Sequence, residues 1–332
     1  VESAEQQTGQ HDAERLRPTE QGHGDGVEAD RADHADGQRG GDAAHVGRQR
    51  SLRTRQTRTL ALVVSDIANP SFATMASAAE DYAHQFGYSL SVYNTHDDIE
   101  RETNYVRTAT QRWIDGVLFV SAEDRMTSLD ALESAGIPSV AIDRIPQHYT
   151  GPSVTLDNTK AGYIAAKYLL DLGHTCIAHI SGPTKLRLVR ERMAGYQAAL
   201  AERGLPPDAC IIREGDWVCE SGYAAMADIL RGEPRPTAVF AANDRMAIGA
   251  MHAVSQAGLR VPDDISFVGV DDIEVAAYQI PALTTIRQSF AELATLAVQL
   301  LLEIIEHGRP EQPQIMIEPQ LIERQSVVPF HP

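Results

Sequence analysis

Short aliphatic runs alternate with longer amphipathic segments along most of the chain from residue 59 onwards. A short, uninterrupted apolar run is typical of a strand that is buried on both faces of a parallel sheet. The segments between these runs repeat apolar positions at helical spacing. The pattern therefore predicts a first β-α series, with strands at residues 59–65, 89–93, 117–120 and 139–142 and helices at 70–86, 99–113 and 127–134.

The alternation then restarts with a helix at 157–170. The second series has expected strands at residues 176–180, 211–216, 238–241, 265–270 and 283–287, and further helices at 189–203, 221–230, 244–257 and 290–306. Two β-α series of similar size predict an α/β protein with two doubly wound lobes, each a parallel sheet with helices on both faces. The long helix at 290–306 is a candidate to cross back to the first lobe.

Residues 1–50 follow neither a helical nor a strand period. They contain eight glycines, and their only large aliphatic residues are Val1, Leu16, Val27 and Val46. Such a segment buries too little apolar area to offset the entropy of ordering, so we expect a disordered tail. A metal ion needs clustered ligands on a preformed frame, so we expect no metal site from the four histidines of this tail.

A short basic segment follows the tail at residues 51–58, with Arg53, Arg55 and Arg58. It is either a solvated linker or a hinge that lies near DNA phosphates.

The composition of the chain limits its possible partners and its location in the cell. The net charge of −17 gives no general attraction to nucleic acid, so any DNA contact needs a local basic patch. No apolar run is long enough to cross a bilayer, and no secretory signal is visible, so we expect a cytoplasmic protein without a membrane partner. Three cysteines without a short CxxC pair favour free thiols in a reducing compartment over a disulfide framework. We expect neither a metal nor a cofactor.

Polar side chains follow almost every expected strand. Ligands of open parallel sheets bind beyond the carboxyl ends of the strands, so these residues are the candidates for a binding site. Turn chemistry alone also favours Asp and Asn at such positions. The collective pattern supplies carboxylates, amides, arginines and an aromatic ring to one crevice, as a sugar requires. These strand-end residues are Asp66, Asn69, Asn94, Ser121, Asp143, Arg144, Asp216, Trp217, Asn243, Asp244, Asp271 and Asp272, together with the loop at 182–192.

At these residues the chain resembles the lac-repressor (LacI/GalR) family of regulators and the related periplasmic pentose-binding proteins. The resemblance covers about residues 51–328 and rests on many motifs in one order. They are SLRTRQTRTLALVVSDIANPSF, WIDGVLFV, IPSVAIDR, VTLDNTKAGYIAAKYLLDLGH, HISGP, RERMAGY, AVFAANDRMAIGA, VPDDISFVGVDD, PALTTIRQ and LIERQSV.

The resemblance implies a periplasmic-binding-protein-like core that closes around a small effector. It assigns residues 59–158 and 289–318 to the first lobe and 159–288 and 319–330 to the second, with crossovers near 158, 289 and 319. It implies a ribose-type ligand site, whose expected residues are Asn69, Phe72, Asp143, Arg144, Arg190, Arg192, Trp217, Asn243, Asp271 and Gln288.

Several roles have a simpler structural alternative. Residues 190 and 192 do not share a helix face, so one of these arginines is expected to bind ligand while the other serves structure, and we favour Arg190 as the ligand residue. Asp157 either caps its helix or supports the site. Asp244 and Asp272 are expected to be helix caps. Purine-responsive relatives carry a second aromatic residue where this chain has Ser71, which disfavours a nucleobase.

The chain departs from the family at its start. A regulator of this family begins with a helix-turn-helix head, and residues 1–50 show no such pattern. The leading hypothesis is therefore a homodimeric, LacI-type regulator that binds a monosaccharide such as a pentose, with operator DNA as a partner only if a functional head exists. The alternatives are a sugar-binding protein for transport and an enzyme. No GxGxxG, Walker A, GxSxG or HExxH motif is present, and we expect no catalysis.

Overall fold

The computed structural model describes residues 57–111, 114–206 and 211–331. The expected tail and the hinge residues Arg53 and Arg55 lie outside the described residues. None of the helices in the described ranges is long and apolar enough to cross a membrane.

The first sheet has six strands, and all of its neighbouring strands run parallel. Alternate residues of its central strand face opposite layers, because successive side chains of a strand point to opposite faces. Leu60 and Leu62 pack with helices α2 and α9, whereas Ala61 and Val63 pack with α3 and α4. In order across the sheet, the strands are β11 (Gln314–Ile317), β5 (Ser153–Leu156), β4 (Ser139–Ile142), β3 (Gly116–Phe119), β1 (Thr59–Val64) and β2 (Ser89–Asn94). The helices are α2 (Pro70–Gln85), α3 (Ile99–Gln111), α4 (Thr127–Ser134) and α9 (Phe290–His307).

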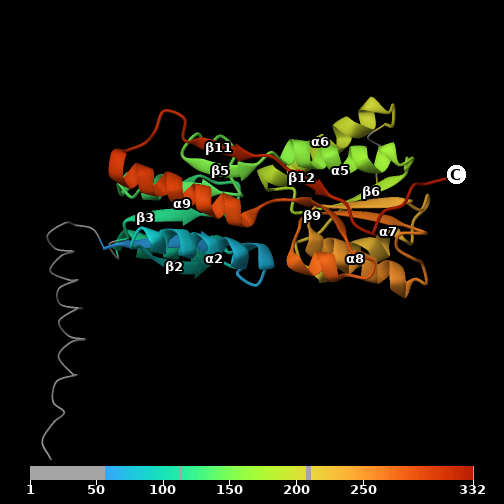
Figure 1. Cartoon of the computed structure of the whole chain (residues 1–332), viewed down its shortest axis with the longest axis horizontal. Helices are drawn as coiled ribbons and strands as arrows, with labels where there is room; N and C mark the ends of the chain where they lie inside the picture. Colours follow the sequence, from blue (N-terminus) through green and yellow to red (C-terminus); the bar gives the residue numbers. More distant parts are fainter. Residues whose placement is uncertain (1–56, 112–113, 207–210, 332) are drawn as a thin grey trace, which may run out of the picture. The chain divides into compact units, whose positions relative to one another are not determined.

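The second sheet also has six strands, parallel except for one antiparallel edge strand. Helices α5 and α6 cover one face and α7 and α8 cover the other (Figure 1). The strand order is β12 (Gln320–Ile322), β10 (Thr284–Arg287), β9 (Ser266–Asp271), β8 (Ala238–Ala241), β6 (Ile177–Ser181) and β7 (Ile211–Glu214). The helices are α5 (Asn158–Asp171), α6 (Arg187–Glu202), α7 (Cys219–Ile229) and α8 (Asp244–Gln256), followed by the 3₁₀ turn η2 (Glu274–Tyr278).

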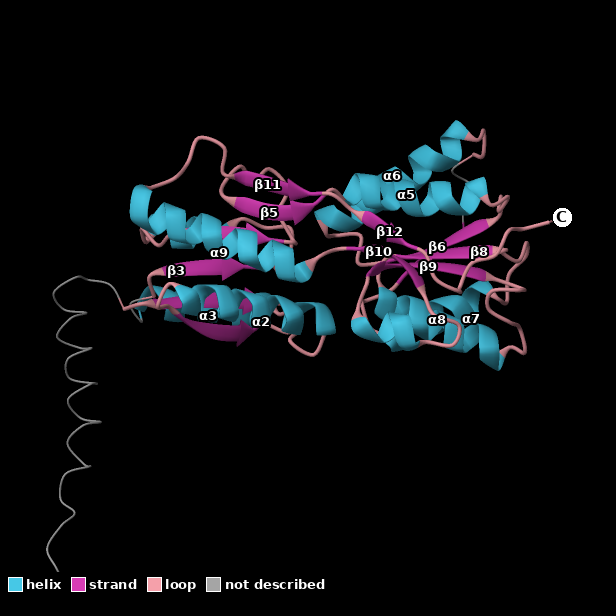
Figure 2. Cartoon of the chain, in the orientation of Figure 1, coloured by secondary structure: helices cyan, strands magenta, loops and turns pink. Residues whose placement is uncertain are grey.

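The chain passes between the two sheets three times: between β5 and α5, between β10 and α9, and between β11 and β12. Each sheet and its helices form one lobe, and the two lobes lie side by side (Figure 2). Below, the first lobe is the sheet that contains β1 and the second lobe is the sheet that contains β6. The predicted two-lobed, doubly wound α/β fold is confirmed.

Three strands were missed at the sequence level: β5, β11 and β12. Each has only three or four residues. The edge strands β11 and β12 also leave most of their side chains partly or fully exposed, so they lack the uninterrupted apolar run that marks the inner strands.

Helices α5 and α6 touch through glycines. A Cβ atom at Gly195 would lie 1.9 Å from the carbonyl oxygen of Thr159, and one at Gly162 would lie 1.9 Å from that of Arg192. Glycine permits this backbone approach, since any side chain would force the helices apart. The contact therefore fixes the position of α6 against α5.

We predict that Gly195→Ala destabilises the protein by about 3 kcal/mol, because overpacking against a backbone oxygen separates the two helices. In an unconstrained helix the same change would stabilise by about 1 kcal/mol. Ala194→Gly, at the exposed neighbouring position, is the matched control and should cost about 1 kcal/mol. Urea unfolding followed by circular dichroism measures both, and a Gly195→Ala variant as stable as the parent would contradict the packing argument.

Candidate functional site

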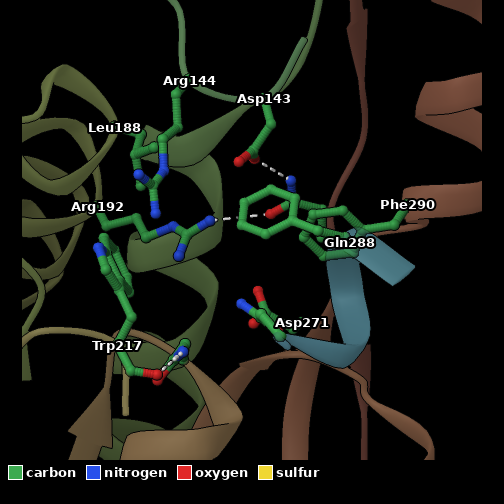
Figure 3. A pocket seen from close by; sticks show the side chains of 11 residues that line it. Asp143, Arg144, Leu188, Arg192, Trp217, Asp271, Gln288 and Phe290 are labelled. Atoms are coloured by element: carbon green, nitrogen blue, oxygen red, sulfur yellow. Dashed lines mark hydrogen bonds between the residues drawn. The ribbon is translucent and has the colours of Figure 1, made fainter. Parts of the chain in front are cut away.

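The carboxyl ends of strands in both lobes meet around one cavity (Figure 3). Its empty space, including the part that is open to solvent, is about 300 Å³. The lining residues are Asn69, Phe72, Asp143, Arg144, Leu188, Arg192, Trp217, Asn243, Asp271, Gln288 and Phe290.

Nine of the ten ligand residues expected from the sequence line this cavity, and Arg190 does not. Leu188 and Phe290 line it without having been predicted. Leu188 lies only two residues from Arg190, so the 182–192 loop pointed to the region but not to this residue. Phe290 begins α9 directly after the second crossover, and its ring meets that of Phe72 edge-on with centroids 6.1 Å apart.

Of the two arginines, the structure brings Arg192 to the cavity rather than Arg190, which the sequence analysis favoured as the ligand residue. Arg192 is buried and reaches the cavity, whereas Arg190 bonds to the carbonyl oxygens of Thr184 and Lys185 and to side chains of the first lobe outside the cavity. Positions two apart point in different directions around a helix. The close packing of α6 on α5 decides which of the two directions leads inward.

Arg192 is the centre of a buried network. Its Nε donates to Asn158 Oδ1 at 2.9 Å, its Nη1 to the carbonyl oxygen of Ala242 at 2.7 Å, and its Nη2 to Gln288 Oε1 at 2.9 Å. The amide nitrogen of Gln288 in turn donates to Asp143 Oδ1. Through Gln288, which follows β10 at the second crossover, the network links the second lobe to the first.

Aromatic rings form two walls of the cavity. Phe72 comes from α2 of the first lobe and Trp217 follows β7 of the second. The guanidinium carbon of Arg144 lies 5.6 Å from the centroid of each ring, within cation–π distance. Arg144 also bonds to Asp97. The guanidinium is therefore held between rings from opposite lobes.

Two buried carboxyl groups face this space. Burial raises the pKa of Asp143, although Arg144 and Arg192 oppose the shift. Burial raises the pKa of Asp271 to about 7; Arg192 opposes this shift and the nearby Asp143 adds to it. Asp271 is therefore close to half protonated at neutral pH, and it can either donate or accept a hydrogen bond.

Three cavity residues adopt a backbone conformation that side chains rarely take. The φ angles of Asp143, Trp217 and Asp271 are 62°, 76° and 116°. Strained non-glycine residues of this kind concentrate at functional sites, because the strain aims a side chain that an ordinary turn would direct elsewhere. Gly182 makes room for one of them, since a Cβ there would lie 2.3 Å from the Trp217 ring.

Two cavity amides also cap helices. The side chain of Asn69 accepts a hydrogen bond from the backbone N–H of Ser71 at the start of α2. The side chain of Asn243 accepts from the N–H of Met246 at the start of α8 and donates to the carbonyl oxygen of Trp217 at 3.1 Å. Asn243 thereby positions the strained tryptophan.

The expected caps are only partly found. Asp157 caps α5 by accepting from the N–H of Lys160 at 2.9 Å, which confirms the cap interpretation. The prediction that Asp244 caps a helix is wrong, because Asn243 already occupies the cap position of α8. The Asp244 side chain is fully buried and accepts hydrogen bonds from Thr285 Oγ1 and from the N–H of Ile273.

The prediction that Asp272 caps a helix is also wrong. Its carboxylate accepts from Arg287 and Arg324 instead, and so connects β9, β10 and the segment after β12.

Arg58 is the one predicted hinge arginine within the described residues. Its backbone N–H donates to Asp115 Oδ2 at 2.8 Å, and its guanidinium lies 4.9 Å from the centroid of the Tyr88 ring. These contacts fix the start of β1 to the first lobe.

Comparisons with known proteins agree with this geometry. The family profile of the periplasmic binding protein-like domain matches residues 166–327. The chain is 36% identical over 279 residues to the HTH-type transcriptional repressor PurR of Vibrio campbellii, with 84% of each chain covered.

Two solved structures resemble this chain in both fold and sequence. One is the transcriptional regulator CelR in complex with cellobiose, with a TM-score of 0.77, 30% identity and coverage of 82% of this chain and 85% of that one. The other is a LacI family transcriptional regulator from Enterococcus faecium with bound ribose, with a TM-score of 0.76, 29% identity and coverage of 82% and 100%.

The fold, the cavity and these relatives together define a class of protein: a transcriptional regulator whose core is of the periplasmic-binding-protein type and binds a small effector. Within that class, the chain belongs to the LacI/GalR family, as the resemblance of its motifs predicted. The relatives compared above are a transcriptional repressor and transcriptional regulators, which are not enzymes.

The raised pKa of Asp271 predicts a pH dependence of stability. Between the unfolded pKa near 4 and the folded pKa of about 7, the folded protein binds a proton that the unfolded chain does not, so stability falls as pH rises through this window. Asp271→Asn should reduce the fall in the free energy of unfolding between pH 5 and pH 8 by about 3 kcal/mol. Urea unfolding at both pH values measures this, and an unchanged fall would rule out the buried proton.

Proposed function

We propose that this protein is a LacI-type transcriptional repressor whose core binds a small sugar, with a pentose as the expected class of effector. The observation that supports this most is the convergence of nine predicted ligand residues from two lobes on one cavity. Each lobe supplies a carboxyl group, an arginine and an aromatic ring (Figure 3). No single turn or cap requirement accounts for this combination.

The chemistry of the cavity favours a polyhydroxylated ring. Carboxylates accept pairs of hydroxyl hydrogens, guanidinium groups donate to hydroxyl oxygens, and aromatic faces pack against C–H bonds. The ribose bound by the Enterococcus faecium regulator is a polyhydroxylated ring of this kind, although that ligand belongs to that protein. Ser71 lies where purine-responsive relatives have an aromatic residue, which disfavours a planar base.

In the proposed mechanism the effector shifts the balance between open and closed lobes. The three crossovers act as hinges, and the effector changes the equilibrium only by its different affinity for the two states. Closure then changes the relative orientation of the first lobes in a homodimer and so the spacing of the DNA-binding heads. We place this regulator in the cytoplasm, where operator DNA is found. Operator DNA is a partner only if a functional DNA-binding head exists.

A homodimer is supported by an exposed apolar patch on the second lobe. Around η2, Val275, Tyr278 and Ile280 are 42%, 76% and 98% exposed. Large apolar side chains gathered on a surface mark a site of protein association. We propose a second copy of this chain as the occupant.

The alternative is a binding protein that serves transport without DNA binding. The basic segment at residues 51–58 argues against it. Cell fractionation separates the two functions, because a periplasmic pool would favour transport. A gel-shift assay of the full chain with genomic fragments tests whether it binds DNA at all.

We predict that the true effector raises the melting temperature, and that Asp271→Ala and Arg192→Ala each weaken its binding about 100-fold, since each leaves buried polar partners unsatisfied. A thermal-shift screen of pentoses, hexoses and nucleosides identifies the effector, and titration gives the affinities. Arg203→Ala is the control, because this exposed arginine caps the C-terminal end of α6, about three helical turns beyond Arg192, and pairs with Asp171. Equal stabilisation of the cavity variants and the control would refute the site, and the absence of any stabilising sugar would refute the function.

A further inference from the structure

We propose that Arg190 is a positioning residue that holds the two lobes closed at the rim of the cavity, and thereby sets how long the effector stays bound. It does so without lining the cavity. The proposal rests on the proposed function only for its effect on the effector, because the contact between the lobes is present in the structure itself.

Arg190 forms four hydrogen bonds, two of which join the lobes. Its Nη2 reaches into the first lobe and donates to Asp124 Oδ2 at 2.5 Å and to Gln147 Oε1 at 2.9 Å. Its Nη1 donates to the carbonyl oxygens of Thr184 and Lys185, in the second lobe, at 3.1 and 2.8 Å. The second pair of bonds holds the guanidinium in place, so less side-chain entropy is lost when the first pair forms.

The acceptors in the first lobe are themselves organised. Asp124 lies in the segment after β3 and Gln147 in the segment after β4. The backbone N–H of Gln147 donates to the carboxylate of Asp124, which joins these two segments. Arg190 therefore contacts a preassembled acceptor pair. In the closed arrangement the Asp124 side chain is only 16% exposed, so its ion pair with Arg190 is partly shielded from water.

Two weaker ion pairs also bridge the lobes. Lys185 lies 3.4 Å from Glu123 beside the Arg190 contact, and Arg245 lies 3.3 Å from Asp66. The Lys185–Glu123 ion pair is longer than the Arg190–Asp124 pair, and its lysine side chain is 55% exposed, so it contributes little to the stability of the closed arrangement. Among these three interlobe pairs, the Arg190 contact combines the shortest distance with the most buried acid.

This arrangement makes closure depend on salt. Ion pairs near the surface weaken as ionic strength rises, because counter-ions screen them. A neutral sugar has no such dependence of its own. Salt should therefore open the lobes and accelerate release of the effector, even though no charge on the ligand is involved. Loss of Arg190 should shift the closed-to-open equilibrium by about 5-fold, the scale of a good partly exposed ion pair.

Trp217 reports closure without any ligand. It lines the cavity and is 9% exposed in the closed arrangement, so opening exposes its ring to a small quencher. The other tryptophan of the chain is Trp113. A full-length Trp113→Phe background leaves Trp217 as the single tryptophan, and acrylamide quenching of its fluorescence then measures the accessibility of the cavity at increasing NaCl concentrations.

We expect quenching in the background protein to rise with salt. Arg190→Gln should raise the quenching constant at low salt and reduce its salt dependence, and Asp124→Asn should do the same from the other lobe. The double variant should be no more open than either single variant, because both substitutions remove one interaction. Arg187→Gln is the matched control, since this arginine of the same helix pairs with Glu191 within the helix.

Quenching of Arg190→Gln that matches Arg187→Gln at every salt concentration would overturn the proposal. Additive effects of the Arg190 and Asp124 substitutions would also overturn it, because they would show two separate causes. Far-UV circular dichroism checks that each variant is folded, and Asp124→Asn tests the same contact if the substitution in α6 harms folding. The thermal-shift screen tests the effector function independently, so either idea can fail alone.

Discussion

The buried guanidinium of Arg192 is the interaction on which the interlobe cavity depends. It bonds to Asn158 at the start of α5, to the carbonyl oxygen that follows β8, and to Gln288 at the second crossover. A buried charge without such partners would cost several kcal/mol. The attraction of Asp143 and Asp271 for this cation offsets part of their own burial. Helices of the second lobe, a crossover and both carboxyl groups therefore hold one another in place.

The arrangement of the cavity residues lowers the folding stability of the protein at the place where the ligand is expected to bind. Asp143, Trp217 and Asp271 adopt strained backbone conformations, and the two carboxyl groups are buried together in a small space. A protein selected for stability alone would avoid each of these features. Their concentration at one set of strand ends is the physical signature of a site that is prepared for a polar ligand. The rim contact of Arg190 is complementary, since it holds the lobes closed from outside the cavity.

Much of the fold and most of the site could be predicted because both follow from local order along the chain. Each inner strand is an apolar run, and the residues at its C-terminal end lie at the carboxyl edge of the sheet, as Asp143 and Asp271 do. The short strands β5, β11 and β12 were missed because pairing with a neighbouring strand defines them more than their own sequence does. The roles of Asp244 and Asp272 were wrong because their partners lie far away in sequence, at Thr285, Arg287 and Arg324.

The sequence by itself determined the two parallel lobes and the residue types available between them, since hydrophobic periodicity and strand order are encoded locally. Only the tertiary structure decided which side chains face the cavity. Arg190 and Arg192 are indistinguishable in a motif, and the rotation of α6 sends one to the rim and the other inward. That rotation is set by backbone contact at Gly162 and Gly195, where two helices approach too closely for any side chain. Such a contact depends on both helices at once, so neither segment reveals it alone.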